Sequence, residues 1–579
     1  MMRDGRPVPD GVLEKLASAL SHRGPDENGE LVRGDVGFVH TRLAIVDIEG
    51  GGQPFVSTPG TALIANGEIY NDTNLRREFS SAQFKSKSDC ESALHLYGAR
   101  QERFADDLRG MYALAIHDPI KNKLILARDP FGVKPLYYAE TSAGFCFSSE
   151  PQALIAAGLV TADQDTSVRD EILSLQFSTE TQSPFKNIYR VAPGETVIVR
   201  NGRISSRIMR PDVLSSDTRA RSDKDAVMEF GEAWRESVSV HQRSDVPYGM
   251  FLSGGLDSAA VLAMMAQLND APVLAYTAAF PGANVCDERE NARKVAEAAG
   301  AHHVEIEISA ADFWNNLPQI AAAMDDLAPD YAIVPTFLLA KRAARDVKVV
   351  LTGEGGDEMF AGYGRYRAAL RPWPFAKRPY RRHILAKSGV LRALPTHWRA
   401  GLGAVERRIS RGESSNLSAL QKVDCATWLP NDLLIKLDRC LMAHGVEGRV
   451  PFLDPKVAKF AFSLKEDQKV RGGLGKWILR QWLSENFPAA AAFERKRGFT
   501  VPVAEWIAAE GLRVGPLVAR QEGISEICEP GAVEALFRNV TARNGHAAWV
   551  LLFYALWHRR HMLGIDPVGD VFETLSAPI

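Results

Sequence analysis

The segment from Val246 to Met265 reads as an apolar strand, a tight loop and an alanine-rich helix. The small and polar residues of that loop are Ser253, Gly254, Gly255, Asp257 and Ser258. Adjacent glycines let backbone N–H groups approach phosphate oxygens, the hydroxyls add donors, and the helix dipole favours an anion. No Gly-Lys-Ser/Thr follows the glycines, so the loop differs from the P-loop of kinases and GTPases. The pattern predicts a pyrophosphate-binding loop in which Asp257 holds Mg²⁺.

A second glycine-rich loop carries an unusual density of carboxylates. It follows the apolar segment Val347–Leu351, spans Thr352–Tyr363, and contains Glu354, Asp357 and Glu358. In an open parallel sheet, ligands bind at the carboxyl ends of the strands, so this loop should lie beside the first. A solvated turn has no need of so many carboxylates. We therefore expect a second Mg²⁺ ligand and a base close to phosphate.

One lysine stands at the expected start of a helix farther along the chain. Lys476 belongs to the segment GLGKWILR. A positive charge at this point could stabilise negative charge that develops on a phosphoryl or acyl-adenylate group. A single lysine is more often a surface residue, so this interpretation depends on the two loops.

The elements around these loops favour an α/β fold. After Val246, apolar strands alternate with long helices, which predicts a doubly wound parallel sheet. A helix should begin after Ser222, because Ser222 and Asp225 resemble a capping box. Its buried face would carry Val227, Phe230, Trp234 and Val238. After about residue 360, the pattern is mostly helical.

The amino-terminal part has a different pattern. Short β-rich runs between Gly37 and Arg200 predict layered β structure, interrupted by helices at Gly11–Ser21 and Asp89–Ala105. A polar stretch then separates the two patterns. We predict a first domain at 1–208, a linker at 209–223 and a second domain at 224–579.

Composition excludes several classes of protein. The 579 residues are too many for one core, and 69 basic against 71 acidic residues give no net field that would attract nucleic acid or a membrane surface. The run KRPYRR, Lys377–Arg382, reads as a solvated surface patch. Six cysteines lack CxxC spacing, and no apolar run approaches the length of a membrane span. We expect a cytoplasmic protein with no zinc site, no nucleic acid partner and no membrane partner.

The motifs of the second part together resemble a known family. SGGLDS is similar to the loop of the ATP pyrophosphatases, and with TGEGGDEMFAGY, GVEGRVPFLD and GKWILR it resembles glutamine-dependent asparagine synthetase. The resemblance implies ATP and Mg²⁺ as cofactors, with aspartate as a substrate. It implies Mg²⁺ ligation by Asp257 and Asp357, formation of an aspartyl-adenylate with Glu354, and stabilisation of that intermediate by Lys476. The residues it places around ATP and pyrophosphate are Ser253, Gly254, Gly255, Asp257, Ser258, Ala278, Thr352 and Gly353.

Five motifs of the first part are similar, in the same order, to segments of the class II glutamine amidotransferases. They are HRGPD, HTRLAIVD, NGEIYN, SDCE and ARDPFGVKPLYY. The resemblance implies a layered αββα fold of the Ntn-hydrolase type. It implies that Arg42 binds the α-carboxylate of glutamine, that Glu68 and Asp89 bind its α-amino group, and that Asn66 and Gly67 form an oxyanion hole. Ile45 and Val46 complete the implied glutamine-binding set.

The start of the chain departs from that family. Its members begin Met-Cys-Gly, and the exposed cysteine is the nucleophile, with its own α-amine as base. This chain begins Met1, Met2, Arg3. We expect a misplaced start codon or a truncated sequence, because the implied glutamine pocket is otherwise intact. Cys90 lacks a terminal amine and is expected to pack in the core.

Three functions are compatible with these residues. The first is ATP-dependent amidation of aspartate with nitrogen from glutamine, or from ammonia if the terminal cysteine is absent. The second is a relative of the β-lactam synthetases, or another adenylating amide synthetase, whose first domain is a relic. The third and least favoured is a non-catalytic nucleotide-binding scaffold. The sequence leaves the acceptor carboxylate open, and the resemblance implies a homodimer.

Overall fold

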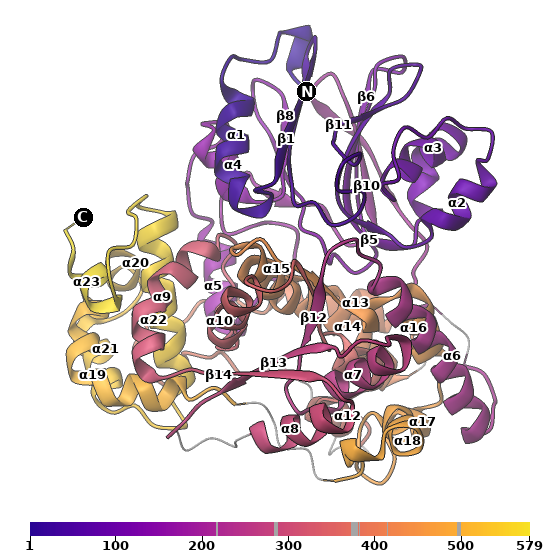
Figure 1. Cartoon of the computed structure of the whole chain (residues 1–579). Coiled ribbons are helices and arrows are strands. Elements are labelled where there is room, and N and C mark those ends of the chain that lie inside the picture. The colour runs from indigo at the N-terminus through magenta and orange to yellow at the C-terminus, as the bar shows by residue number, and fades with distance from the viewer. Residues whose placement is uncertain are drawn as a thin grey trace.

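The computed structural model describes most of the chain (Figure 1). The described residues are 1–215, 218–282, 288–371, 380, 382–413, 415–494 and 500–578. Within them, no helix has both the length and the apolar character that crossing a membrane would require.

The first part of the chain is built mainly from antiparallel strands. Its strands are β1 (Glu27–Arg33), β2 (Val36–Arg42), β3 (Phe55–Val56), β4 (Ala62–Ile69), β5 (Gly110–Asp118), β6 (Lys123–Arg128), β7 (Tyr137–Glu140), β8 (Phe145–Ser148), β9 (Tyr189–Arg190), β10 (Glu195–Arg200) and β11 (Arg203–Met209). Its helices are α1 (Val12–Leu20), α2 (Asp72–Glu78), α3 (Glu91–Arg100), α4 (Pro151–Ala156) and α5 (Thr166–Leu175).

These elements form four layers. A six-stranded sheet of order β11-β10-β6-β5-β4-β3 stands against the smaller sheets β1-β2 and β8-β7-β9. Alternate residues of β4 point to opposite faces, so Leu63 packs with the helix residue Leu94, while Ile64 packs with Phe38 of β2. Helices α1 and α4 cover the smaller sheets, and α2 and α3 lie on the far side (Figure 1). The predicted layered αββα arrangement is confirmed.

The second part contains a parallel sheet and many helices. Its strands are β12 (Tyr248–Phe251), β13 (Leu274–Ala279), β14 (His302–Glu307), β15 (Val349–Leu351) and β16 (Glu447–Arg449). The helices up to the last strand are α6 (Asp223–His241), α7 (Leu256–Leu268), α8 (Arg289–Ala298), α9 (Ala310–Ala323), α10 (Ile333–Ala343), α11 (Gly356–Phe360), α12 (Gly364–Ala369), α13 (Ala400–Ser410), α14 (Asn416–Ala426) and α15 (Leu434–Met442). The helices after it are α16 (Pro455–Ser463), α17 (Glu466–Lys469), α18 (Trp477–Asn486), α19 (Val503–Ala519), α20 (Glu522–Ser525), α21 (Pro530–Arg538), α22 (Gly545–His561) and α23 (Val571–Ser576).

The topology of the parallel sheet explains where a ligand would bind. The strand order is β14-β13-β12-β15-β16, and all neighbours are parallel. The chain moves outward in opposite directions from β12 and β15, so the topological switch point lies between these two strands. Met250 of β12 is paired with Leu351 of β15. The two glycine-rich loops therefore leave the same edge of the sheet side by side, as the sequence predicted.

Local predictions agree with the structure at most positions. The Ser222 side chain accepts the Asp225 N–H at the start of α6, and Phe230 and Trp234 on its inner face are fully buried. The predicted helical stretch Asp89–Ala105 is found as two elements, α3 at Glu91–Arg100 and a 3₁₀ helix at Gln101–Asp107. Gln101 has a φ of 56°, and its amide donates to two carbonyls of the last turn, so the α-helix ends there.

Two further predictions have partial outcomes. The expected strand Val347–Leu351 begins only at Val349, because β12 and β16 both start their pairing with it there. Most of the basic run Lys377–Arg382 lies outside the described residues. Tyr380 is described, and its hydroxyl donates to Asp424.

Buried ion pairs join the two parts of the chain. Arg23 of the first part makes two contacts with Asp438 of α15, at 2.8 and 2.9 Å. Arg190 of β9 does the same with Asp326, at 2.7 and 2.6 Å, and Asp326 also accepts the Tyr137 hydroxyl. Charged groups this far from water are stable only when they are paired. The two parts satisfy one another's buried charges only when they are docked in this arrangement.

We expect Asp326→Ala to lower the free energy of unfolding by about 3–5 kcal/mol, because it leaves the Arg190 guanidinium buried without its counter-charge. The matched control is Asp467→Ala, which removes the partner of an exposed Arg471 and should cost about 0.5 kcal/mol or less. Denaturant unfolding followed by fluorescence measures both. Equal losses in the two variants would contradict the role assigned to the junction.

Candidate active sites

The first glycine-rich loop has the geometry of an anion-binding turn. Gly254 has a φ of 66°, a left-handed conformation that favours glycine, and a Cβ there would lie 3.0 Å from the Glu288 carbonyl oxygen. Gly255 is the N-cap of α7, so the first N–H groups of that helix face the loop. The Ser253 and Ser258 hydroxyl oxygens lie 3.2 Å apart. The loop thus gathers hydroxyls and a helix N-terminus at the edge of the sheet.

Lys476 contacts both glycine-rich loops, although all three segments lie far apart in the sequence. Its ammonium forms ion pairs with Asp257 of the first loop and with Asp357 of α11, the latter at 2.6 Å. Lys476 is 1% exposed. Burial lowers the pKa of Lys476, but the two carboxylates outweigh that effect and hold the pKa above its usual value. The site therefore contains a buried positive charge between two carboxylates.

The second loop packs directly on the first. A Cβ on Gly353 would lie 2.8 Å from the Asp257 Cβ, so a larger residue would separate the loops. Thr352 is buried, and its Oγ1 has no hydrogen-bond partner among the described residues. An unpaired buried hydroxyl costs free energy unless something fills its hydrogen bond. The ATP contact expected for Thr352 and Gly353 stays a prediction.

Two charged residues beside Glu354 were missed by sequence reasoning. Lys436 of α15 lies 3.2 Å from a Glu354 carboxylate oxygen and 3.3 Å from an Asp330 oxygen. Burial lowers the pKa of Lys436, and the Glu354 and Asp330 carboxylates raise it further than burial lowers it. The signal was present, because a lysine inside an apolar helical run is unusual. The Lys436 ammonium group fixes the carboxylate of Glu354 at the mouth of the second loop.

The donor set at this site fits Mg²⁺. Mg²⁺ is usually held by one or two carboxylates, with phosphate oxygens and waters as its other ligands. Asp257 and Asp357 supply two carboxylates from two loops that touch. No group of three or more His, Cys, Asp or Glu side chains with metal-binding geometry occurs among the residues that the structure describes. The pair therefore suits a phosphate-bound Mg²⁺ better than a cage made of protein alone.

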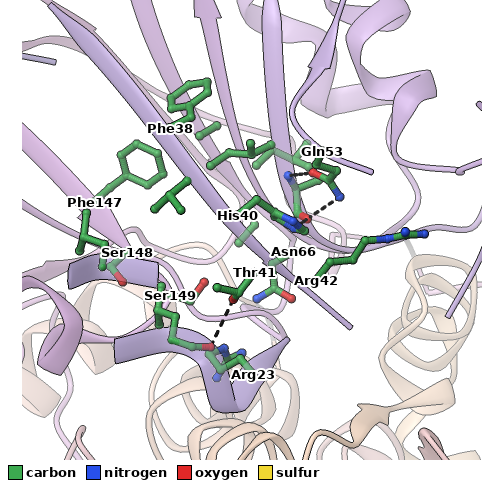
Figure 2. Close-up of a pocket in the computed structure, with 18 of the residues that line it drawn as sticks. Arg23, Phe38, His40, Thr41, Arg42, Gln53, Asn66, Phe147, Ser148 and Ser149 are labelled. Atoms are coloured by element: carbon green, nitrogen blue, oxygen red, sulfur yellow. Dashed lines mark hydrogen bonds between the residues drawn. The ribbon is translucent and has the colours of Figure 1, made fainter. Parts of the chain in front are cut away.

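A cavity of about 210 Å³ lies inside the first part of the chain (Figure 2). Its lining includes every residue of the predicted glutamine-binding set, namely Arg42, Ile45, Val46, Asn66, Gly67, Glu68 and Asp89. Figure 2 shows Arg42, His40 and Asn66 around this cavity. The Arg42 guanidinium donates to the Asp47 carbonyl at 2.6 Å and to Glu27 at 2.8 Å. These contacts hold the guanidinium beside the cavity.

Asn66 presents an unpaired hydrogen-bond donor in this cavity. Its Nδ2 is buried and has no hydrogen-bond partner among the described residues. The next residue, Gly67, has a φ of 145°, and a Cβ there would collide with the Met111 carbonyl oxygen of β5. An unpaired amide donor next to a glycine that allows close backbone approach is the arrangement that an oxyanion needs.

Two carboxylates close the other side of the cavity. Asp89 accepts the Ile69 N–H, and burial raises the pKa of Asp89 to about 6. Glu68 is 2.8 Å from the Arg449 guanidinium of β16, which belongs to the second part of the chain. Neither contact was anticipated from the sequence. The pair provides the negative charge that an α-ammonium group would bind.

Two other titratable residues at the cavity are neutral. Burial raises the pKa of the Cys90 thiol far above its usual value, and the thiol donates to the Gly67 carbonyl at 3.3 Å. Cys90 is packed, as predicted, and is no thiolate nucleophile. Burial lowers the pKa of His40 to about 4, and His40 contacts the Ala65 carbonyl. The sequence gave no reason to single out His40, because its burial results from residues that pack around it only in the folded protein.

Comparison with known proteins follows the same division. The asparagine synthase family matches residues 229–559, and the glutamine amidotransferase domain family matches residues 3–209. The chain belongs to the asparagine synthase family. Asparagine synthetase [glutamine-hydrolyzing] 1 of Bacillus subtilis (strain 168) is 30% identical, over 94% of this chain and 93% of the relative. Asparagine synthetase B [glutamine-hydrolyzing] of Escherichia coli (strain K12) is 29% identical, over 85% of this chain and 79% of the relative.

Family membership gives the two sites a common purpose. An asparagine synthase domain uses ATP, and a glutamine amidotransferase domain supplies nitrogen. The chain is therefore a ligase for ATP-dependent amidation with glutamine as nitrogen donor. The structure brings together Asp257, Asp357 and Lys476 in one site and Glu354 with Lys436 beside it. The roles of the individual residues remain predictions.

We expect Gly254→Ala to weaken ATP·Mg²⁺ binding about tenfold or more, because alanine disfavours the left-handed backbone and its methyl group would press on the Glu288 carbonyl. Gly300→Ala is the matched control, since Gly300 also has a positive φ, of 62°, but has open space around its Cβ position. Isothermal titration measures both. Equal weakening in the two variants would mean that strain alone, and not the loop, is responsible.

Proposed function

We propose that this protein converts L-aspartate to L-asparagine through a β-aspartyl-adenylate, with release of AMP and pyrophosphate. The observation that carries the proposal is the meeting of Asp257, Asp357 and Lys476 at the switch point of the parallel sheet. A charged cluster of this kind beside an anion-binding loop suits phosphate transfer. The names of the curated relatives favour aspartate as the acceptor.

Adenylation would take place between the two loops. The Ser253–Ser258 loop binds the β- and γ-phosphates of ATP, while Thr352, Gly353 and Ala278 contact the rest of the nucleotide. A β-carboxylate oxygen of aspartate attacks the α-phosphorus, and the bond to pyrophosphate breaks. Lys476 stabilises the charge that develops on the transferred phosphoryl group. Mg²⁺, when bound by Asp257 and Asp357, would neutralise phosphate charge in this site.

Amide formation would follow at the mouth of the second loop. Ammonia attacks the acyl carbon, the bond to AMP breaks, and a proton leaves the nitrogen. Glu354 is placed to accept that proton, because its carboxylate is paired with Lys436. Asp330 shares the same lysine, so two carboxylates face one ammonium group.

With the terminal cysteine that the family uses as nucleophile, the first domain would deliver the ammonia, and without that cysteine free ammonia would be the nitrogen source. Arg42 binds the α-carboxylate of glutamine, Glu68 and Asp89 bind its α-ammonium group, and Asn66 and Gly67 stabilise the oxyanion. We propose that ammonia then passes through the protein interior to the second domain. The assigned units are 1–208, a linker at 209–223 and 224–579, which is supported by the end of β11 at Met209 and the start of α6 at Asp223.

We also propose Mg²⁺ as the metal, the cytoplasm as the compartment and a homodimer as the assembly. The cysteines among the described residues, Cys90, Cys146, Cys425, Cys440 and Cys528, are all free. Free cysteines are typical of a reducing compartment. Light scattering after size-exclusion chromatography tests the assembly.

Purified protein given ATP, Mg²⁺ and ammonia should release AMP with L-aspartate and should form asparagine. Asp257→Asn and Glu354→Gln should each lower turnover about a hundredfold or more, because each removes a charge that acts on the reacting groups. The exposed Asp270→Asn is the control and should keep full activity. Release of ADP in place of AMP would refute the adenylation. Product formation from another carboxylate, or ring closure of an internal amine, would refute the choice of aspartate.

Arg42→Lys should weaken L-glutamine binding strongly while leaving ammonia-dependent synthesis almost unchanged. Lysine keeps the charge but loses the two-pronged contact with a carboxylate. Calorimetry with L-glutamine measures the first effect, and AMP release with ammonia measures the second. Equal damage to both would show that the domains do not divide the work as proposed.

A further inference from the structure

Arg449 is a charged residue of the second domain that contacts Glu68, one of the residues that line the glutamine pocket. It ends strand β16 and has an exposed fraction of 0%. Its Nη2 lies 2.8 Å from a Glu68 carboxylate oxygen, and Glu68 lines the cavity of the first domain. A side chain of the synthetase domain therefore contacts a residue that lines the pocket that would recognise glutamine.

Other contacts lock this guanidinium in one orientation. Its Nε donates to Glu447 at 2.9 Å, and Glu447 also accepts from Lys134 of the first domain at 2.8 Å. Its Nη1 donates to the carbonyls of His241 and Arg243, at 3.0 and 2.6 Å. With the other nitrogens held, Nη2 is left to face Glu68. A planar group held in this way is a positioning device more than a mobile counter-ion.

The backbone of the same residue supports the ATP loop. The Thr352 N–H donates to the Arg449 carbonyl oxygen at 2.9 Å, and Arg449 is paired with Leu351 in the sheet. Thr352 and Gly353 begin the second loop. One residue therefore contacts a glutamine-recognition carboxylate through its side chain and the nucleotide loop through its main chain.

We propose that Arg449 is a positioning residue of the glutamine site, which holds the Glu68 carboxyl group in place for the α-ammonium group of glutamine and ties it to the ATP loop. The inference rests on the proposed function of the first domain. In this proposal, one buried residue links the glutamine site of the first domain to the ATP loop of the second.

The electrostatics of Glu68 require such a partner. Burial raises the pKa of Glu68 well above its usual value, and the neighbouring Asp89 and Glu447 raise it further. The Arg449 and Lys134 cations act in the opposite direction. Tyr70, which is buried at the end of β4 and uncharged, also interacts with Glu68, as do Cys90 and Arg243. Removing Arg449 would raise the pKa of Glu68 further, and a neutral carboxyl group binds an ammonium group poorly.

The test compares Arg449→Met with Arg449→Lys by titrating L-glutamine into the full-length protein between about pH 6 and about pH 8.5. Arg449→Met should weaken binding about tenfold or more at neutral pH, and the loss should shrink as pH rises and Glu68 ionises. Arg449→Lys should restore much of the affinity. The control is Arg109→Met, which removes a half-buried junction arginine, paired with Asp454 and Glu236, and should leave the pH profile as in the wild type.

A second readout tests the tie to the ATP loop. In the wild type, saturating α,β-methylene-ATP with Mg²⁺ should change the affinity for L-glutamine several-fold, and Arg449→Met should abolish that change. The tie would be overturned if the analogue changed the glutamine affinity of Arg449→Met as much as that of the wild type. It would also be overturned if the analogue left the glutamine affinity of the wild type unchanged. A pH-independent loss of glutamine binding in Arg449→Met, equal to that in Arg109→Met, would overturn the positioning role.

These failures are separable from failure of the proposed function. If the wild-type protein bound no L-glutamine, the glutamine site itself would be refuted, and the inference with it. If the wild type bound L-glutamine and Arg449→Met bound it equally well at every pH, the function would stand and only the inference would fall.

Discussion

Buried charges at the junction between the two domains constrain the whole molecule. Arg23, Arg190 and Arg449 are almost entirely removed from water, and each finds its counter-charge on the opposite domain. The free-energy cost of leaving such a group unpaired exceeds that of any single surface contact. The domains can therefore dock in essentially one way, and both active sites inherit their relative placement from that docking.

Within the second domain, the order of the strands determines which loops lie side by side. The parallel sheet reverses its winding between β12 and β15, so two loops that lie about a hundred residues apart in the chain emerge together. Gly353 lets the two loops touch each other, and Gly254 lets the first loop pass close to the Glu288 carbonyl oxygen. Lys476, brought in by the start of α18, then neutralises the carboxylates that the loops present. Neighbouring negative charges could not be held so close without it.

The glutamine pocket shows the same balance of charge and burial. The carboxyl groups of Glu68 and Asp89 both have raised pKa values because they are buried, and the cations that oppose this rise include Arg449 of the second domain as well as Lys134 of the first. An unpaired amide at Asn66 is tolerated in the same cavity. Buried polar groups with incomplete hydrogen bonding are usual where a ligand is expected to complete them.

Much of this protein could be read from its sequence. The two glycine-rich loops at the edge of the sheet and the capped helix α6 depend on short-range patterns of glycine, charge and periodicity, and the structure places them as those patterns predicted. The five amidotransferase motifs were recognised by their resemblance to a family, and the glutamine-binding residues predicted from them line one cavity. The end of α3 at Arg100 was missed, because a single left-handed residue stops the helix without any apolar break in the pattern. Residue contacts across large sequence separations were not predictable. Nothing local to Glu68 indicates Arg449, and nothing local to Glu354 indicates Lys436. Motifs are determined by the sequence because they are local, whereas these ion pairs form through space and exist only once the tertiary fold has removed both partners from water.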